Sequence, residues 1–127
     1  MGDKGYQTPE GRCIISEEVI ATIASTAAVT VPGVAGMAPR VKDLRGLVSS
    51  TALRSVSVVN NETEIIVDVY INLEAGVRIP DVAGQVQRVV KEEVQSMTSR
   101  PVTKVNVHVV GIVLEDKKEP EAQQPAE

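Results

Sequence analysis

The segment 65–74 reads IIVDVYINLE and carries the clearest structural signal in the chain. Its odd-numbered side chains are all aliphatic, whereas the even-numbered ones after Ile66 all carry a polar group. Successive side chains of a strand point to opposite faces of a sheet. The alternation therefore predicts a strand with one buried and one largely solvent-exposed face, as is typical of antiparallel pairs.

The residues just before this segment predict its hairpin partner. Val56 and Val58 alternate with serines, which indicates a second strand. The pair Asn60-Asn61 then favours a turn, because Asn tolerates left-handed backbone angles. We therefore expect a β-hairpin over residues 52–74.

Two helices are predicted, one on each side of this hairpin. Ser16 suits the N-cap of a helix over residues 17–29, because its side-chain oxygen can accept from the exposed amides of the first turn. Val31-Pro32-Gly33 ends that helix, since Pro has no amide hydrogen. After the hairpin, apolar residues recur at helical spacing over residues 80–97, where Pro80 suits the first turn.

Further strands are predicted at both ends of this pattern. Within residues 104–109, valines alternate with polar side chains, which predicts a last strand over residues 102–113. Residues 11–15 could form a short first strand. Residues 34–50 are expected to be an irregular connection with room for one short strand or helical turn. The predicted fold is α+β, with the order (β)-α-β-β-α-β and two helices packed on one face of a small mixed, mainly antiparallel sheet. With the first strand included, this is the order of the ferredoxin-like arrangement.

The length of 127 residues fits one domain. We expect residues 11–114 to form it, between a disordered N-terminal arm (1–10) and a disordered acidic tail (115–127). The tail holds a net charge of −3 out of a total of −4, so the remaining body is close to neutral. Such a body argues against the broad positive surface of a nucleic-acid-binding domain.

The sequence lacks the residues that a disulfide, a zinc site or a membrane-spanning segment would need. Cys13 is the only cysteine and His108 the only histidine, so neither an intramolecular disulfide nor a zinc site of three His or Cys ligands is expected. The sequence has no run of about 20 apolar residues and no apolar signal core. We therefore expect no cofactor, no small-molecule substrate and no direct insertion into a membrane.

GRCIISEEVI (residues 11–20) and VPGVAGM (31–37) are followed by the predicted hairpin, by residues 82–94, by Met97-Thr98 and by VNVHV (105–109). This ordered set of motifs resembles the alkaline-shock family of Gram-positive envelope stress proteins. The resemblance covers about residues 11–113. It implies a non-enzymatic protein of cell-envelope homeostasis and of the response to alkaline or general stress. It also implies a cytoplasmic location, with some members held beneath the membrane by a separate membrane-embedded partner and some self-associating. The family supplies no catalytic residues to transfer.

Two alternative functions rest on single features. His108 is a candidate general base if Asp68 orients it and Ser55 or Ser57 is the nucleophile, but an exposed polar position on a sheet face is the simpler interpretation. Gly33-Val34-Ala35-Gly36 matches the bare G-x-x-G pattern with which KH domains clamp single-stranded nucleic acid. That pattern should be followed closely by a helix, whereas Pro39 intervenes here, so a turn is the preferred interpretation.

The preferred function is a scaffold or interaction module that works by self-association and by docking to a membrane-anchored protein partner. Two groups of residues are candidates for its surface. The first is a basic group in the 34–50 connection, and the second lies on the polar face of the predicted sheet, where Tyr offers a large apolar area with a polar tip. The candidates are Arg40, Lys42, Arg45, Tyr70, Asn72, Asn106 and His108.

Overall fold

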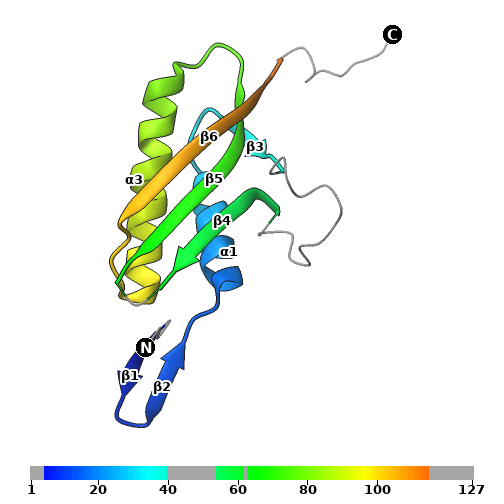
Figure 1. Cartoon of the computed structure of the whole chain (residues 1–127). Coiled ribbons are helices and arrows are strands. Elements are labelled where there is room, and N and C mark those ends of the chain that lie inside the picture. Colours follow the sequence, from blue (N-terminus) through cyan, green and yellow to red (C-terminus); the bar gives the residue numbers. More distant parts are fainter. Residues whose placement is uncertain (1–4, 40–53, 62, 115–127) are drawn as a thin grey trace.

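A computed structural model describes residues 5–39, 54–61 and 63–114. Within these ranges, two helices cover one face of a mixed sheet, and a separate two-stranded hairpin projects beyond its end (Figure 1). The elements in chain order are β1 (Gly5–Thr8), β2 (Gly11–Ile14), α1 (Glu17–Ala28), β3 (Val34–Met37), β4 (Val56–Asn60), β5 (Ile65–Glu74), α3 (Ile79–Thr98) and β6 (Lys104–Val113).

Strand β5, which has the clearest signal in the sequence, is the central strand of the sheet. Strand β6 runs parallel to it along one edge and pairs with it from Ile66 to Glu74, with one register shift after Ile71. The other edge is shared by two shorter antiparallel strands: β4 pairs with the first half of β5, and β3 pairs with the second half (Figure 1). The predicted α+β class and the mixed, mainly antiparallel sheet are therefore confirmed.

The core lies between this sheet and the two helices and is built from aliphatic side chains. The alternation along β5 appears directly in burial, since Ile65, Val67, Val69, Ile71 and Leu73 are all fully buried. Helix α3 places a valine against them at every fourth position, and α1 adds smaller side chains. Burying one such aliphatic side chain stabilises a fold by about 1.5–3 kcal/mol. The core residues on the two helices include Ile20, Ala24, Ala28, Val82, Val86, Val90 and Val94.

The ends of both helices follow local sequence signals. Ser16 caps α1 as predicted, because its Oγ accepts a hydrogen bond from the amide of Val19 at 3.2 Å. Helix α3 ends at Thr98. Its C-cap is Ser99, which has a left-handed conformation (φ 60°) and whose amide donates to the Gln95 carbonyl at 2.9 Å. The two predicted helices therefore exist within one or two residues of the expected ends.

Arg100 ties together the loops at one end of the sheet. Its guanidinium donates to the Asn60 side chain and to the Asn61 carbonyl. Asn60 is itself buried, and its Nδ2 donates to the Ile15 carbonyl at 3.2 Å. This link connects the β4–β5 turn, the loop after α3 and the start of α1, so a polar residue is accommodated in the core with its bonds made.

The N-terminal region differs from the expected arrangement. Part of the arm expected to be disordered forms β1, which pairs with β2 around a turn at Pro9-Glu10. The expected first strand does exist as β2, but it belongs to this hairpin and not to the main sheet. Both edges of β5 are already occupied, by β6 and by β3 with β4, so the ferredoxin-like arrangement is not formed. The short strand allowed for in the 34–50 connection is β3.

The hairpin partner of β5 is shorter than expected. Strand β4 begins at Val56, and Arg54 and Ser55 before it are helical. Arg40, Lys42 and Arg45 and the acidic tail lie outside the described residues.

Candidate functional site

The face of the sheet opposite the helices carries a cluster of polar and aromatic side chains. They come from the even-numbered positions of β5 and β6, which point away from the core because side chains alternate along a strand. In Figure 1 this face is turned towards the viewer, with both helices behind it. We call it the open face, and its cluster consists of Asp68, Tyr70, Asn72, Asn106 and His108.

A stacked pair of rings lies at the centre of the cluster. Tyr70 and His108 are register partners on the parallel strands β5 and β6. Their ring centroids are 4.3 Å apart and the ring planes differ by 7°. Stacking restricts the rotamers of both side chains, so the pair is held in one arrangement before any partner binds.

Asp68 holds the imidazole of His108 from the neighbouring position on β5. Its Oδ1 lies 3.1 Å from His108 Nε2. The side chains are partly open to solvent, with exposed fractions of 25% for Asp68 and 44% for His108. The imidazole is therefore fixed by two neighbours, a carboxylate at its edge and a phenol ring on its face, and still remains reachable.

A β-bulge in β6 shapes the upper part of the open face. The register shifts after Val109, so that Asn72 is paired with Gly111. A Cβ atom at Gly111 would lie 3.0 Å from Asn72 Oδ1, which means that the Asn72 amide occupies the space that a side chain would need. The bulge and the glycine together let Asn72 lie flat over the edge strand.

Apolar residues border the cluster at the lower end of the sheet. Val59 on β4 and Ile66 on β5 are register partners on the open face, and Val59 is 45% exposed. The candidate residues taken from the sequence did not include this border. The same alternation that identified Tyr70 could have found it, because Ile66 is the aliphatic exception among the even-numbered positions.

The geometry does not assemble the hydrolase considered from the sequence. Asp68 does contact His108, as that hypothesis required, but Ser57 is the register partner of Asp68 on the far side of β5. The carboxylate thus stands between the serine and the imidazole, whereas a base must contact its nucleophile directly. Within the described ranges, no group of three or more His, Cys, Asp or Glu side chains could hold a metal ion.

The G-x-x-G segment is also structural in this fold. Gly33 has a φ of +99° in the turn after α1, and a Cβ atom there would lie 3.0 Å from Val82 Cγ2. Gly36 belongs to β3, which pairs with β5. The segment therefore leads into a strand of the sheet and not into the helix that the nucleic-acid hypothesis requires.

Of the seven candidate surface residues, the structure brings four together on the open face: Tyr70, Asn72, Asn106 and His108. Their role in binding stays a prediction.

Comparison with known proteins places this fold in a family. Residues 5–114 match the alkaline-shock protein 23 family, which is described as having a cell envelope-related function. The chain belongs to this family. The match begins at β1, so the family region includes the N-terminal hairpin, and the envelope-related family expected from the sequence motifs is confirmed.

Relatives in Bacillus and Streptococcus share most of the chain. The uncharacterized protein YqhY of Bacillus subtilis is 36% identical over 116 residues, which cover 84% of this chain and 81% of that protein. YloU of the same organism is 36% identical over 110 residues, covering 84% and 92%. Spy1535 of Streptococcus pyogenes is 30% identical over 113 residues, covering 87% and 86%.

Solved structures of the MamM CTD have a similar arrangement. One variant matches with a TM-score of 0.48 at 17% identity, over 76% of this chain and 98% of that chain.

Of the helices that the structure describes here, none has both the length and the apolar character of a membrane span.

Proposed function

We propose that this protein is a non-enzymatic interaction module of the inner cell-envelope surface. It acts by self-association and by docking to a membrane-anchored protein, in the response to alkaline or general stress. Membership of a family with a cell envelope-related function supports the setting. The open face supports the mode of action.

The observation that carries the proposal is the Tyr70–His108 stack held by Asp68 on a sheet face that no described element covers. Tyrosine is enriched at protein interfaces because it joins a large apolar area to a hydroxyl group. The stack and the carboxylate contact fix both rings before binding, which reduces the conformational entropy that a partner must remove.

The chemistry of the face defines the partner that it suits. Asn72 and Asn106 each offer amide donors and acceptors beside the rings. Val59 and Ile66 add an apolar border at one end. A protein segment with an apolar anchor for the rings and backbone groups for the two amides would satisfy this surface.

The proposal is tested by locating the protein in cells and by capturing its partner. A fluorescent fusion of the full chain is compared with a Tyr70→Ala/His108→Ala variant and with a Gln85→Ala control, whose side chain is exposed on α3. Tagged versions of the same chains are used to recover membrane proteins after gentle solubilisation. Loss of two central interface side chains typically weakens binding by more than tenfold.

We expect the unaltered chain and the Gln85→Ala control to lie at the cell periphery and to recover the same membrane protein. The double variant should be distributed through the cytoplasm and should lose that protein. An even cytoplasmic distribution of the unaltered chain would contradict the envelope setting. An unchanged double variant would contradict the role of the open face.

A further inference from the structure

The outer side of α1 carries a row of exposed side chains that contains no charge. Val19, Thr22, Thr26 and Val29 are spaced by three, four and three residues, which places them in one line along a helix. Val19 is 48% exposed and Val29 46% exposed, and both threonines are exposed. No charged residue occurs from Val19 to Val31. A helix face turned to water usually carries charged side chains, so this row has the composition of a contact surface.

Three hydroxyl groups on or beside this row are bonded to backbone carbonyls of α1 and of the turn after it. Thr22 donates to the Glu18 carbonyl at 2.9 Å, Ser25 to the Thr22 carbonyl at 3.1 Å and Thr30 to the Ala27 carbonyl at 2.7 Å. A hydroxyl that keeps such a bond can be buried without the full cost of losing water. Thr22 in particular can present its methyl group outwards.

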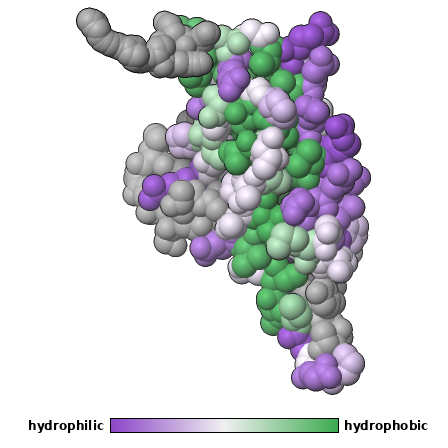
Figure 2. All heavy atoms as spheres, turned by 180° about the vertical axis from the view of Figure 1, so that it is seen from behind, coloured by the Kyte–Doolittle hydropathy of each residue, from purple (hydrophilic) through white to green (hydrophobic). Residues whose placement is uncertain are grey.

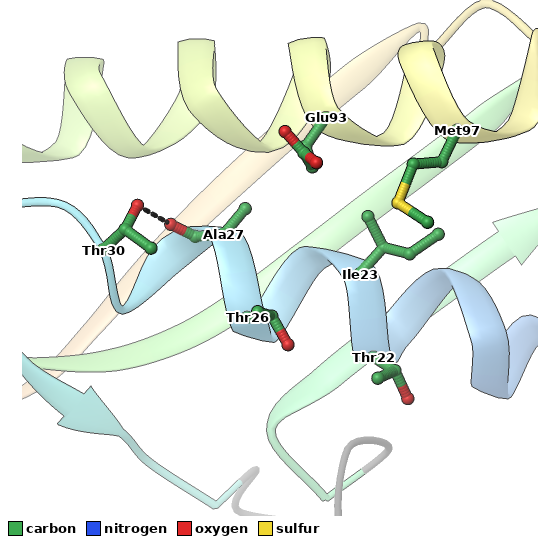
Figure 3. Close-up of a pocket in the computed structure, with 7 residues that line it drawn as sticks. All are labelled: Thr22, Ile23, Thr26, Ala27, Thr30, Glu93 and Met97. Carbon is green, nitrogen blue, oxygen red and sulfur yellow. Dashed lines mark hydrogen bonds between the residues drawn. The ribbon is translucent and has the colours of Figure 1, made fainter.

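A groove of about 350 Å³ lies beside the row, between α1 and α3 (Figure 3). Ile23 and Ala27 form its floor on α1, and Met97, which is 61% exposed, stands on its α3 side. Figure 2 shows the helix side of the molecule, where apolar and weakly polar surface runs along the middle and hydrophilic side chains of α3 border it. Glu93 is the one charged residue in the lining of the groove and lies on its α3 side. The row and the groove together make one surface of low polarity, with this carboxylate at its α3 border.

We infer that this surface pairs two copies of the chain through antiparallel α1 helices. The row reads the same in both directions, as V-x-x-T-x-x-x-T-x-x-V over residues 19–29. In an antiparallel pair, Val19 faces Val29 of the partner subunit and Thr22 faces Thr26 of the partner subunit. Each layer then joins side chains of the same kind, which is the self-complementarity that a two-fold interface requires.

The charge at the start of α1 favours the antiparallel orientation. Glu17 and Glu18 lie in its first turn. At 100° per residue, Glu17 lies on the other side of α1 from the row, whereas Glu18 lies beside the row and is exposed. A parallel pair would therefore set the Glu18 carboxylates of the two copies side by side. An antiparallel pair keeps these two carboxylates apart, and it also opposes the two helix dipoles.

This inference rests on the self-association in the proposed function and adds the surface that performs it. The open face lies on the opposite side of the sheet, so a dimer formed through α1 leaves both open faces free for a further partner.

The oligomeric state of the full chain tests the inference. Sedimentation equilibrium is measured for the unaltered chain, for Thr26→Glu and for Gln85→Glu, which adds the same charge on the solvent side of α3. Circular dichroism checks that each variant is folded. We expect a dimer for the unaltered chain and for Gln85→Glu, and at least a tenfold weaker association for a folded Thr26→Glu.

Cysteine crosslinking tests the register, also where Thr26→Glu fails to fold. In a Cys13→Ser background, Thr22→Cys and Thr26→Cys chains are oxidised separately and as a mixture. The antiparallel register predicts a disulfide-linked dimer in the mixture and little in either chain alone. In a parallel pair, two copies of the same variant would be linked by a disulfide in each separate sample. This result would overturn the inference.

The outcomes separate the inference from the proposed function. An oligomer that Thr26→Glu leaves intact, with no crosslink in the mixture, overturns the α1 surface and leaves self-association standing. A chain that is monomeric at every concentration overturns both the α1 surface and the proposed self-association, while docking through the open face is judged by the capture experiment.

Discussion

At the scale of single residues, the Tyr70–His108 stack can be isolated from the rest of the fold. Both side chains lie on the open face, so their removal leaves the core unchanged. Stacked aromatic pairs contribute about 0.5–1.5 kcal/mol beyond the area that they bury. We expect a double-mutant cycle of Tyr70→Ala and His108→Ala to give a coupling energy at the lower end of this range.

The cycle is measured by urea unfolding of the four chains. The pair Tyr70→Ala and Lys104→Ala is a matched control, because Lys104 is the register partner of Ile66 and lies four positions before His108 on the same strand. Distant sites normally add independently. Equal coupling in the two cycles would show that the stacked rings contribute nothing of their own to stability.

Gly33 and Gly76 have the same kind of backbone conformation, but replacing them should destabilise the fold to different extents. Both have a positive φ, +99° and +93°, which other residues adopt only with strain of about 1–3 kcal/mol. A Cβ atom at Gly33 would also press on Val82 and Val77, whereas one at Gly76 meets nothing within 4 Å. We therefore expect Gly33→Ala to destabilise the fold by about 1–3 kcal/mol more than Gly76→Ala.

Urea unfolding of both variants measures this difference directly. Similar losses would mean that the valines next to Gly33 move aside without cost. A greater loss for Gly76→Ala would contradict the packing explanation.

The sequence predicted which residues share the open face and suggested the contact of Asp68 with His108, but it did not predict that Tyr70 and His108 stack. Strict alternation is enough to place Tyr70 and His108 away from the core, because the core side of β5 is so consistently aliphatic. Their contact depends on the parallel register between β5 and β6, and the position of Asn72 depends on the bulge after Val109. The register and the bulge both depend on where the connection through α3 places β6 beside β5. Local sequence patterns do not determine this placement.

At the scale of elements, the two helices and three of the strands were predictable because each has a signal of its own. Ser16, Pro80 and the alternating valines act over a few residues. The N-terminal hairpin has a weaker signal: β2 was expected as a short strand at residues 11–15, whereas β1 lies in the arm that was expected to be disordered. Their pairing follows from the turn between them and from the lack of a free edge on β5.

This hairpin should be the least stable of the described elements. It projects beyond the sheet (Figure 1), and Ile14 at its end is 63% exposed. An isolated two-stranded hairpin is marginal in water. We expect the amides of β1 and β2 to exchange with solvent at least about a hundredfold faster than the paired amides of β5, which open only with the whole fold.

Hydrogen exchange followed by NMR resolves the two groups of amides. Protection of β1 and β2 equal to that of β5 would contradict this expectation and would indicate that the hairpin packs against another chain. The same measurement at low and at high protein concentration separates a hairpin that is stable by itself from one that is protected by a second chain. Only in the second case does protection fall on dilution.

At the scale of the whole molecule, the fold uses the two sides of its sheet differently. One side is covered by α1 and α3 over an aliphatic core, and the other carries the open face. The outer surface of α1 faces solvent. It lacks the charged side chains that a solvent-exposed helix face usually carries, and it is not buried as the inner face of α1 is. The periodic isoleucines and alanines of α1 identify its buried face from the sequence alone. The palindromic row on its outer side is defined by the exposure of each residue, which periodicity does not give.

A dimer that pairs through α1 must link stability to concentration. Association stabilises the folded chain by mass action, so each tenfold rise in concentration adds about 1.4 kcal/mol per dimer. For an assembly of this size, such an increment raises the Tm by on the order of 3 °C. We expect that rise in thermal scans of the unaltered chain and of Gln85→Glu over concentrations that span their dissociation constants. Thr26→Glu should melt at one temperature at all concentrations below its own, higher dissociation constant, because it unfolds there as a monomer. A Tm of the unaltered chain that does not change with concentration, although sedimentation shows a dimer, would mean that association and folding are independent and that the α1 contact does not stabilise the subunit.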